Sequence, residues 1–493
     1  MAIPVESFFL TPGFAGTLQQ QIRQRVAEGI LSGRLRPGDK MPSSRGLALH
    51  LGVSRITVTL AYTDLVSSDY LSARGRSGYY VSQSAPKQPD FARPAERGRD
   101  AVDFAALTGR RFSAQTVVQK PGDWRDYPYP FIYGQADISL FDHQNWRLCA
   151  LRALGKRDFA ALTSDYYEQD DPLLIECIIR NILPRRGIDA RPDEVLLTLG
   201  AQNGLWLAAQ VLLGPGRVAA IENPCYPGLR SILGLMDARV VAVDVDAAGL
   251  PPEALPAGVD VVFTTASHHC PTNATMPLDR RMAFLQAAAA RNFVIVEDDY
   301  EFEMSFLAAV SPALKSLDPD GRVIYVGSFS KSLFPGLRLG YLVGPAAFIR
   351  EARALRATVL RHPPGHIQRT VAYFLAMGHY DALINRLKSA YKRRRVIMDE
   401  AIRDTGLTVA GQGVFGGSSF WMQAPEHVDT AELALRLRAQ GVLVEPGRVF
   451  YAPEAGPRNF YRLAYSSIAN SHIAEGVRRV AVAIGETGPT APH

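Results

Sequence analysis

Residues 323–341 read VIYVGSFSKSLFPGLRLGY, a short apolar run followed by small polar residues, glycines and one lysine. The apolar run Val323–Val326 is typical of a buried strand. In an open α/β sheet, ligands bind beyond the carboxyl ends of the strands, which is where Lys331 falls. A lysine there can form a Schiff base with an aldehyde cofactor, although an exposed surface lysine fits the same pattern.

The sequence repeats this arrangement of a strand, a loop and a helix-period stretch from about residue 128 onward. The expected strands are Val195–Leu199, Val218–Ile221, Val240–Val245, Val259–Thr264, Phe293–Val296 and Val323–Val326. This alternation predicts an α/β domain with a mostly parallel sheet and helices on both faces. The pattern of residues 391–484 is more mixed, and we expect a smaller α+β subdomain there.

A phosphate site is indicated at the first of these strand ends. Gly200, Ala201 and Gln202 precede a long apolar helix. Small residues at a helix N-terminus let backbone N–H groups approach an anion, and the helix dipole favours its charge. A plain tight turn has the same sequence, so this motif alone is weak. Arg338 would add a charged clamp on the phosphate.

A second strand end, after Phe293–Val296, carries Asp298 and Tyr300. A carboxylate in this position can keep a pyridinium nitrogen protonated, and the tyrosine can bond a ring hydroxyl. Acidic residues at a strand end are also often a solvated cap.

The first 84 residues have a different pattern, that of a winged helix-turn-helix. We expect helices over 17–30, 43–51 and 54–67, with Ser43 or Ser44 and then Ser54 as N-caps, followed by a hairpin over 71–81. A recognition helix enters the major groove with its N-terminal residues leading. An αα-hairpin with a surface β-ribbon is the alternative.

Composition agrees with a DNA-binding N-terminal domain on a larger body. The 493 residues carry a net charge of +6, and residues 1–84 hold nine Lys/Arg against five Asp/Glu. That imbalance predicts an anionic partner, although a basic domain without one is as compatible with charge alone. The four cysteines have no CxxC spacing, so we expect no metal site and no disulfide framework. No apolar run is long enough for a membrane helix and no signal peptide is visible, so we expect a cytoplasmic protein.

The stretch MPSSRGLALHLGVSRITVTLAYTDLVSSDYLSARGRSGYYV (41–81) closely resembles the winged head of the GntR family. The resemblance implies double-stranded operator DNA as a partner. The residues that it places at the DNA are Ser43, Ser44, Arg45, Ser54, Arg55, Thr57, Arg74, Arg76 and Gly78.

The string SFSKSLFPGLRLGY (328–341) resembles the cofactor-lysine signature of aspartate-aminotransferase-type enzymes, and the likeness covers about residues 130–485. It implies a fold-type I domain that binds pyridoxal 5'-phosphate, with Lys331 as the Schiff-base lysine. The other cofactor residues that it implies are Asp298, Tyr300, Arg338, Ser328, Gly200, Ala201, Gln202 and Tyr226. It also implies that Arg462 holds a substrate carboxylate and that Tyr167 is lent by a neighbouring subunit.

Two departures bear on catalysis. Cys270-Pro271-Thr272-Asn273 stands where these enzymes carry Asn-Pro-Thr-Gly, so the asparagine that bonds the ring hydroxyl is missing. Without that donor we expect proton transfers of transamination to be mistuned. The usual Tyr-Gly-Asp-Pro string is replaced by residues 167–172, which alters the mouth of the site.

The order of the two domains resembles the MocR/GabR family of bacterial regulators. We divide the chain into a DNA-binding domain (1–84), a linker (85–127) and an aminotransferase-like effector and dimerisation domain (128–493). The resemblance implies a head-to-tail homodimer that senses a small primary amine by Schiff-base exchange at Lys331 and controls a catabolic operon. Residues 130–135 and 183–188 look closer to the rhizopine, taurine and ectoine branches than to the γ-aminobutyrate branch. Two alternatives are a DNA-binding protein with genuine aminotransferase activity and one whose body is only a dimerisation scaffold.

Overall fold

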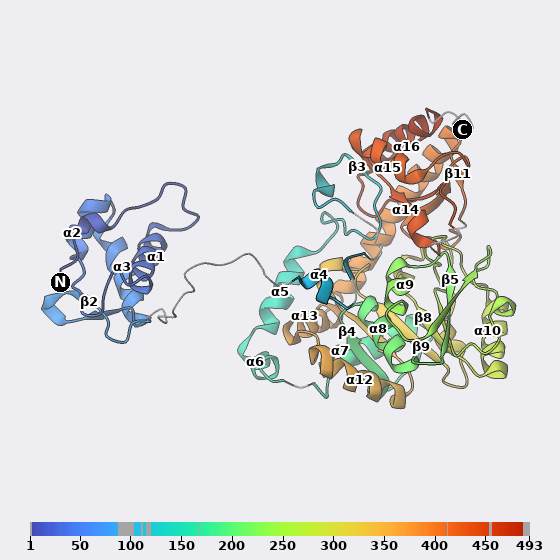
Figure 1. Cartoon of the computed structure of the whole chain (residues 1–493), viewed down its shortest axis with the longest axis horizontal. Coiled ribbons are helices and arrows are strands. Elements are labelled where there is room, and N and C mark those ends of the chain that lie inside the picture. The colour runs from blue at the N-terminus through green and yellow to red at the C-terminus, as the bar shows by residue number, and fades with distance from the viewer. Residues whose placement is uncertain are drawn as a thin grey trace. The chain divides into compact units, whose positions relative to one another are not determined.

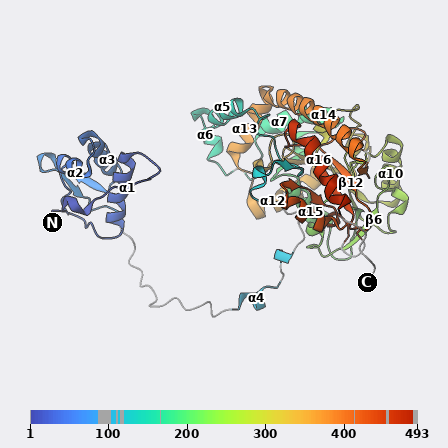
Figure 2. The same ribbon diagram turned by 90° about the horizontal axis from the view of Figure 1, so that it is seen from above.

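The computed structural model describes residues 2–86, 103–109, 112–114, 120–165, 167–411, 413–452 and 456–486. The chain divides into two compact units, residues 1–110 and residues 111–493, which we call the head and the body (Figures 1 and 2). Much of the predicted linker lies outside the described residues. At its two ends, Ala85 packs in the core of the head and Trp124 packs on the body.

The head has the three helices and the hairpin that its sequence predicts. They are α1 (Leu18–Leu31), α2 (Ser44–Leu51), α3 (Arg55–Ser67), β1 (Leu71–Ala73) and β2 (Tyr79–Val81). Ser43 Oγ accepts from the Gly46 N–H at 3.0 Å, and Ser54 Oγ accepts from the Thr57 N–H at 3.1 Å, so both serines are N-caps. Gly52 ends α2 with a φ of +65°, which a glycine adopts without strain.

The body is built on one seven-stranded sheet. Its strands are β4 (Val195–Thr198), β5 (Val218–Asn223), β6 (Arg239–Asp244), β7 (Val261–Thr264), β8 (Val294–Asp298), β9 (Val323–Ser328) and β10 (Gly340–Val343). The order is β4-β10-β9-β8-β7-β5-β6, and only β10 runs antiparallel to its neighbours. The mostly parallel sheet is confirmed, while β10 was not predicted because Leu339–Val343 follows directly on a loop and has no turn signal of its own.

Helices cover both faces of this sheet. Val296 packs in one cluster with side chains of α8 (Ala201–Leu212) and α9 (Pro227–Leu233), whereas Ile295 packs in another with α10 (Leu278–Arg291). Adjacent residues of a strand point to opposite faces, so both sides of β8 are buried. The other helices of this part of the body are α5 (His143–Ala153), α6 (Lys156–Leu162), α7 (Pro172–Cys177), α11 (Leu314–Leu317), α12 (Ala346–Leu360) and α13 (Gly365–Ala376). The one-turn helix α4 (Phe104–Leu107) belongs to the unit of residues 1–110.

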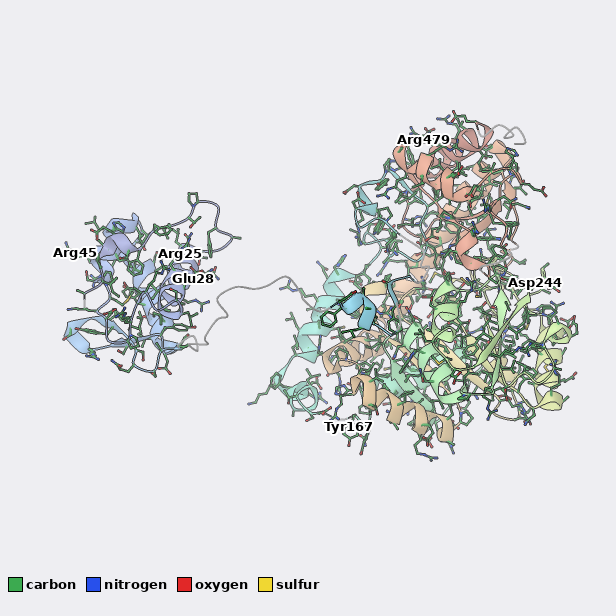
Figure 3. All side chains as sticks on the ribbon, in the orientation of Figure 1. Arg25, Glu28, Arg45, Tyr167, Asp244 and Arg479 are labelled. Atoms are coloured by element: carbon green, nitrogen blue, oxygen red, sulfur yellow. The ribbon has the colours of Figure 1, made fainter. Side chains whose placement is uncertain are left out.

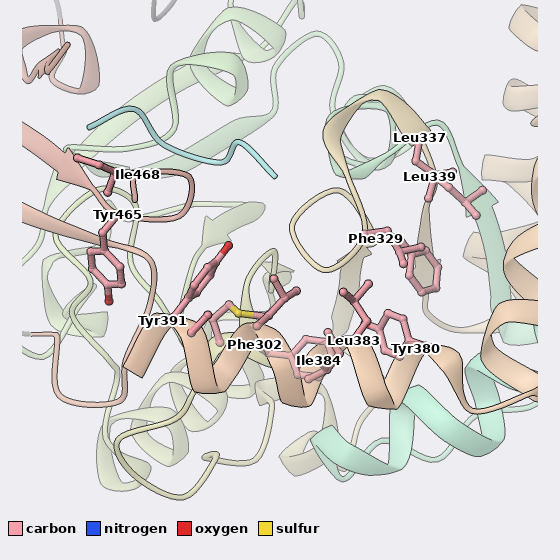
Figure 4. Close-up of a cluster of buried hydrophobic side chains, with 14 of the residues drawn as sticks. Phe302, Phe329, Leu337, Leu339, Tyr380, Leu383, Ile384, Tyr391, Tyr465 and Ile468 are labelled. Atoms are coloured by element: carbon pink, nitrogen blue, oxygen red, sulfur yellow. The ribbon is translucent and has the colours of Figure 1, made fainter. Parts of the chain in front are cut away.

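The C-terminal part of the body is the expected smaller α+β subdomain. The long α14 (His379–Thr405) leads to an antiparallel sheet of order β11-β12-β15-β14, with α15 (Thr430–Ala439) and α16 (Asn470–Gly485) beside it. Its strands are β11 (Thr408–Val409), β12 (Ser419–Gln423), β14 (Glu445–Pro446) and β15 (Phe460–Ala464), and β13 (Val442–Leu443) pairs with β3 (Tyr129–Pro130). Tyr380 and Leu383 project from α14 toward Phe329, next to the segment that carries Lys331 (Figure 4). Within the described residues, no helix is both long and apolar enough to cross a membrane.

Candidate cofactor and DNA-binding sites

A cavity of about 320 Å³ opens at the carboxyl ends of the body strands. It brings together residues that are far apart in the sequence and that were predicted as one site: Ala201, Gln202, Tyr226, Asp298, Tyr300, Ser328, Lys331, Arg338 and Arg462. Gly200 lies beside it, since an added Cβ would come within 3.4 Å of the Arg338 guanidinium. A larger hollow of about 840 Å³ lies between α7 and α12, but it contains none of the predicted residues.

Lys331 is held against an aromatic ring at the centre of this cavity. Its Nζ lies 4.1 Å from the ring centroid of Tyr133, and an added Cβ on Gly134 would fall on that nitrogen. Burial lowers the pKa of Lys331 to about 8, against the opposing attraction of Glu301. A larger fraction of the amine is therefore uncharged near neutral pH, as a nucleophile requires. The contacts of Gly134 and Tyr133 with Lys331 were not predicted, because only the folded chain brings these residues together.

Asp298 ends β8 and is a buried residue of the cavity wall. Among the described residues, its Oδ1 has no hydrogen-bond partner. Burial, with the neighbouring charge of Asp299, raises the pKa of Asp298 to about 7. A buried acceptor without a partner fits a ligand that brings its own N–H donor or positive charge, such as a pyridinium.

The part of the cavity beside Arg338, which we call the phosphate end, fits a phosphate. Arg338 donates from Nη2 to the carbonyl of Leu199 at 3.0 Å, which places its guanidinium beside the turn that starts α8. Gly200 has a φ of +79° in that turn, and Ala201 follows as the first residue of the helix. Ser328 Oγ accepts from the N–H of Ser330 at 3.1 Å. A guanidinium and a helix N-terminus together favour an anion at this end.

Arg462 is more constrained than the sequence indicates. Its Nε donates to Glu445 Oε2 at 2.7 Å, and its guanidinium lies 4.1 Å from the Tyr133 ring centroid and 4.7 Å from that of Phe450. Glu445 also accepts from the N–H of Tyr133 at 3.2 Å. The carboxylate therefore orients the arginine and balances its charge. Sequence reasoning missed Glu445, which lies on a short strand without a recognisable motif.

Cys270 takes the place of the missing asparagine in the cavity wall. It is buried in a cluster with Trp421 and Phe450, against which Tyr226 and Tyr300 pack. Burial raises the pKa of the Cys270 thiol to about 12, so it stays protonated and is at best a weak donor.

Tyr167 does not belong to this cavity. Its side chain is 39% exposed, and the Arg361 guanidinium lies 4.5 Å from its ring centroid, near the lower edge of the body in Figure 3. Large apolar side chains of α5 and α6 are also exposed, together with the residue that follows α5: Leu148, Leu151, Leu154 and Phe159.

On the head, most of the predicted DNA-binding residues lie at the surface. Ser54 and Arg55 begin α3 and are exposed, while Thr57 is half-buried and shares a 2.8 Å hydrogen bond with Ser54. Arg45 of α2 is exposed as well (Figure 3). Ser43 is exposed, and Ser44 is half-buried at the start of α2.

At the hairpin, Arg74 lies 4.6 Å from the ring centroid of Tyr80, and Lys40 lies 5.8 Å from the same centroid. Gly78 has a φ of +99°, and the side chain of Arg76 lies outside the described residues. The fold thus adds Lys40 to the positive charge of the wing.

Family comparisons agree with this division. Residues 18–81 match a family model described as bacterial regulatory proteins of the gntR family, and residues 149–480 match one described as aminotransferase class I and II. The protein is therefore of the class in which a gntR-type head is joined to a class I and II aminotransferase domain.

Comparisons with individual proteins identify the family more closely. The HTH-type transcriptional regulator TauR of Rhodobacter capsulatus is 66% identical over 98% of this chain and 100% of its own. The HTH-type pyridoxine biosynthesis transcriptional regulator PdxR of Corynebacterium glutamicum is 32% identical over 78% of each chain. Among solved structures, the α-aminoadipate aminotransferase LysN of Thermus thermophilus, complexed with N-(5'-phosphopyridoxyl)-L-leucine, matches 78% of this chain and 99% of its own with a TM-score of 0.69 and 27% identity. The chain belongs to the MocR type of bacterial transcriptional regulators.

Proposed function

We propose that this regulator binds pyridoxal 5'-phosphate in the cavity of Lys331, senses a small primary amine there, and controls a catabolic operon through its head. The supporting observation is that one cavity unites Lys331, whose pKa is lowered, with the phosphate end, Arg462 and the buried Asp298. Within the described residues, Oδ1 of Asp298 has no hydrogen-bond partner. Rhizopine, taurine and ectoine derivatives are the candidate effectors, and a relative from Rhizobium meliloti is named a probable rhizopine catabolism regulatory protein.

The residues of this chain would each meet a different part of the cofactor. Arg338, Ser328 and the turn of residues 200–202 would hold the phosphate, Tyr226 would stack on the ring, and Asp298 would face the pyridinium nitrogen. When bound, the cofactor supplies an aldehyde that condenses with a primary amine. Gly134 leaves room for the Lys331 side chain, and Arg462 would hold an acid group of the effector.

Sensing rather than turnover is the expected outcome of this site. Cys270 stands where aminotransferases place an asparagine, and its protonated thiol is a poor donor to a ring hydroxyl. Genuine aminotransferase activity is the second candidate, favoured by the class I and II match and by the lowered pKa of Lys331. Release of a keto acid would distinguish the two.

The head would read operator DNA as part of a homodimer. Arg45, Arg55 and Arg74 are available at its surface, and GntR-type heads act on DNA. The exposed apolar side chains of α5 and α6 support a head-to-tail dimer, in which a second copy would cover them. In that dimer Tyr167 would reach the cavity of the partner. Residues 85–127 would connect the head to the body, and the protein would work in the cytoplasm at the nucleoid.

The test combines absorbance and DNA binding. The protein purified with pyridoxal phosphate is titrated with primary amines that carry an acid group, while operator affinity is followed in parallel. We expect one amine class to shift the absorbance of the bound cofactor and to change operator affinity without release of a keto acid. A protein that binds no cofactor would overturn the proposal and leave the body a dimerisation scaffold.

A further inference from the structure

Lys120 lies within the predicted linker and yet lines the cavity that contains Lys331. We infer that Lys120 is an effector-binding residue, which holds the acid group of the ligand together with Arg462 and so makes the connecting segment part of the sensor. This inference rests on the proposed function, because it concerns a ligand of the same cavity.

Without Lys120, the cavity offers too little positive charge to neutralise the acid group of a ligand. Arg462 and Glu445 form an ion pair with side chains only 6% and 7% exposed, so together they carry no net charge. An acid group placed against that pair would add a negative charge in a poorly solvated space. Arg338 lies at the phosphate end, and Lys331 is the reacting amine. Among the described residues that line the cavity, Lys120 is the remaining cation.

Lys120 is available for this role. Within the part of the chain that the structure describes, its ammonium makes no salt bridge. Partial burial lowers the pKa of Lys120, the negative charge of Glu445 opposes this, and the nearby charge of Arg125 lowers the pKa further. A second negative charge beside Glu445 would therefore be attracted to this lysine, and its binding would hold the lysine in the cavity wall.

The segment that follows Lys120 is anchored to α15 and β13, which precede Glu445 in the chain. Trp124 packs with Ile132 and Leu443, and the Tyr127 hydroxyl accepts from Arg438 Nε at 3.0 Å. The strand β3 that follows pairs with β13, two residues before Glu445. A ligand bound to Lys120 would thus extend this anchored segment back to residue 120. We expect amines with an acid group to order the segment, and neutral amines to react without doing so.

The experiment compares an acidic and a neutral amine of similar length. Full-length protein loaded with pyridoxal phosphate is titrated with 3-aminopropanoate and with 3-amino-1-propanol, and the half-saturation concentration is taken from the cofactor absorbance. Lys120→Ala should raise that concentration roughly fivefold for 3-aminopropanoate and by less than about twofold for 3-amino-1-propanol. Lys120→Arg keeps the charge and should stay near the wild-type value for both.

Hydrogen exchange gives a second readout that does not depend on the cofactor spectrum. Backbone amides of residues 120–131 should exchange more slowly with 3-aminopropanoate in the wild-type protein, but not in Lys120→Ala. Lys392→Ala, which removes an exposed lysine of α14, is the matched control and should change neither result.

Each contrary outcome has a separate meaning. If the wild-type protein responds to both amines and Lys120→Ala shifts both equally or neither, the role of Lys120 is wrong and the proposed function stands. If no primary amine changes the spectrum of the loaded wild-type protein, the proposed function fails, and this inference fails with it.

Discussion

The predicted functional residues of the two units differ in their exposure to water and in their pairing. In the head, Arg45 and Arg55 are exposed, and within the described residues neither makes an ion pair. In the body, Lys331 and Asp298 are withdrawn from bulk water and have shifted pKa values, and Arg462 is already paired. A surface for a polyanion keeps its charges solvated until the DNA arrives, whereas a site for a small molecule is formed in advance. A substitution in the head should therefore change DNA binding and leave cofactor binding unchanged, and a substitution in the body cavity should do the reverse.

The largest effect is expected for Lys331→Ala. Removing the lysine at the centre of the cavity should abolish the absorbance band of the covalently bound cofactor. Affinity for operator DNA, measured by fluorescence anisotropy without effector, should change by less than about twofold, because we propose that the head makes the DNA contacts. A large loss of DNA binding would break the comparison and show that cofactor and head are tightly coupled.

The next effect concerns stability and pH. The pKa of Asp298 is raised to about 7 in the folded protein from its ordinary value of 3.8, so the folded state binds a proton that the unfolded state releases. The resulting stabilisation is present below about pH 4 and is lost as the pH rises through about 7.

In urea unfolding of the cofactor-free protein, the stability of the wild type relative to Asp298→Asn should fall on the order of 3 kcal/mol between pH 4 and pH 8. The Asn side chain does not titrate, so the difference isolates this carboxyl from other buried acids. A flat difference would show that Asp298 is ionised in the folded protein throughout.

A smaller effect is expected for Gly134→Ala. The added methyl group would displace the Lys331 amine, and we expect cofactor affinity to fall by about 2 kcal/mol. Gly216→Ala is the matched control, because Gly216 also has a positive φ, but no atom of the described residues lies within 4 Å of the added Cβ. Both variants carry similar backbone strain, so equal cofactor affinities for the two would refute the steric argument.

The smallest effect falls on the head. Arg55→Ala should weaken operator binding by about 1.5 kcal/mol and leave the cofactor spectrum unchanged, if Arg55 contacts a base edge. Arg23→Ala, which removes an exposed arginine from α1, serves as the control. Equal losses on operator and on unrelated DNA would identify Arg55 as a phosphate contact instead.

Local patterns predicted much of the framework. The N-caps Ser43 and Ser54, the three head helices and six strands of the central sheet follow from short-range signals, and the structure contains them. The antiparallel β10 and the short strands of the C-terminal sheet were missed, because two to five residues that pair with distant partners carry little periodicity.

The sequence by itself determined the two kinds of domain, the positions of strand ends and helix caps, and the presence of Lys331, Asp298 and Arg338 at those ends. Hydrogen bonds and side-chain periods within a few residues are enough for that. Only the tertiary structure decided that Glu445 balances Arg462, that Gly134 leaves space for Lys331, and that Lys120 reaches the cavity. Most of these contacts join residues that are far apart in the chain. Their strength depends on short distances and on the exclusion of water, and both arise only when the chain folds.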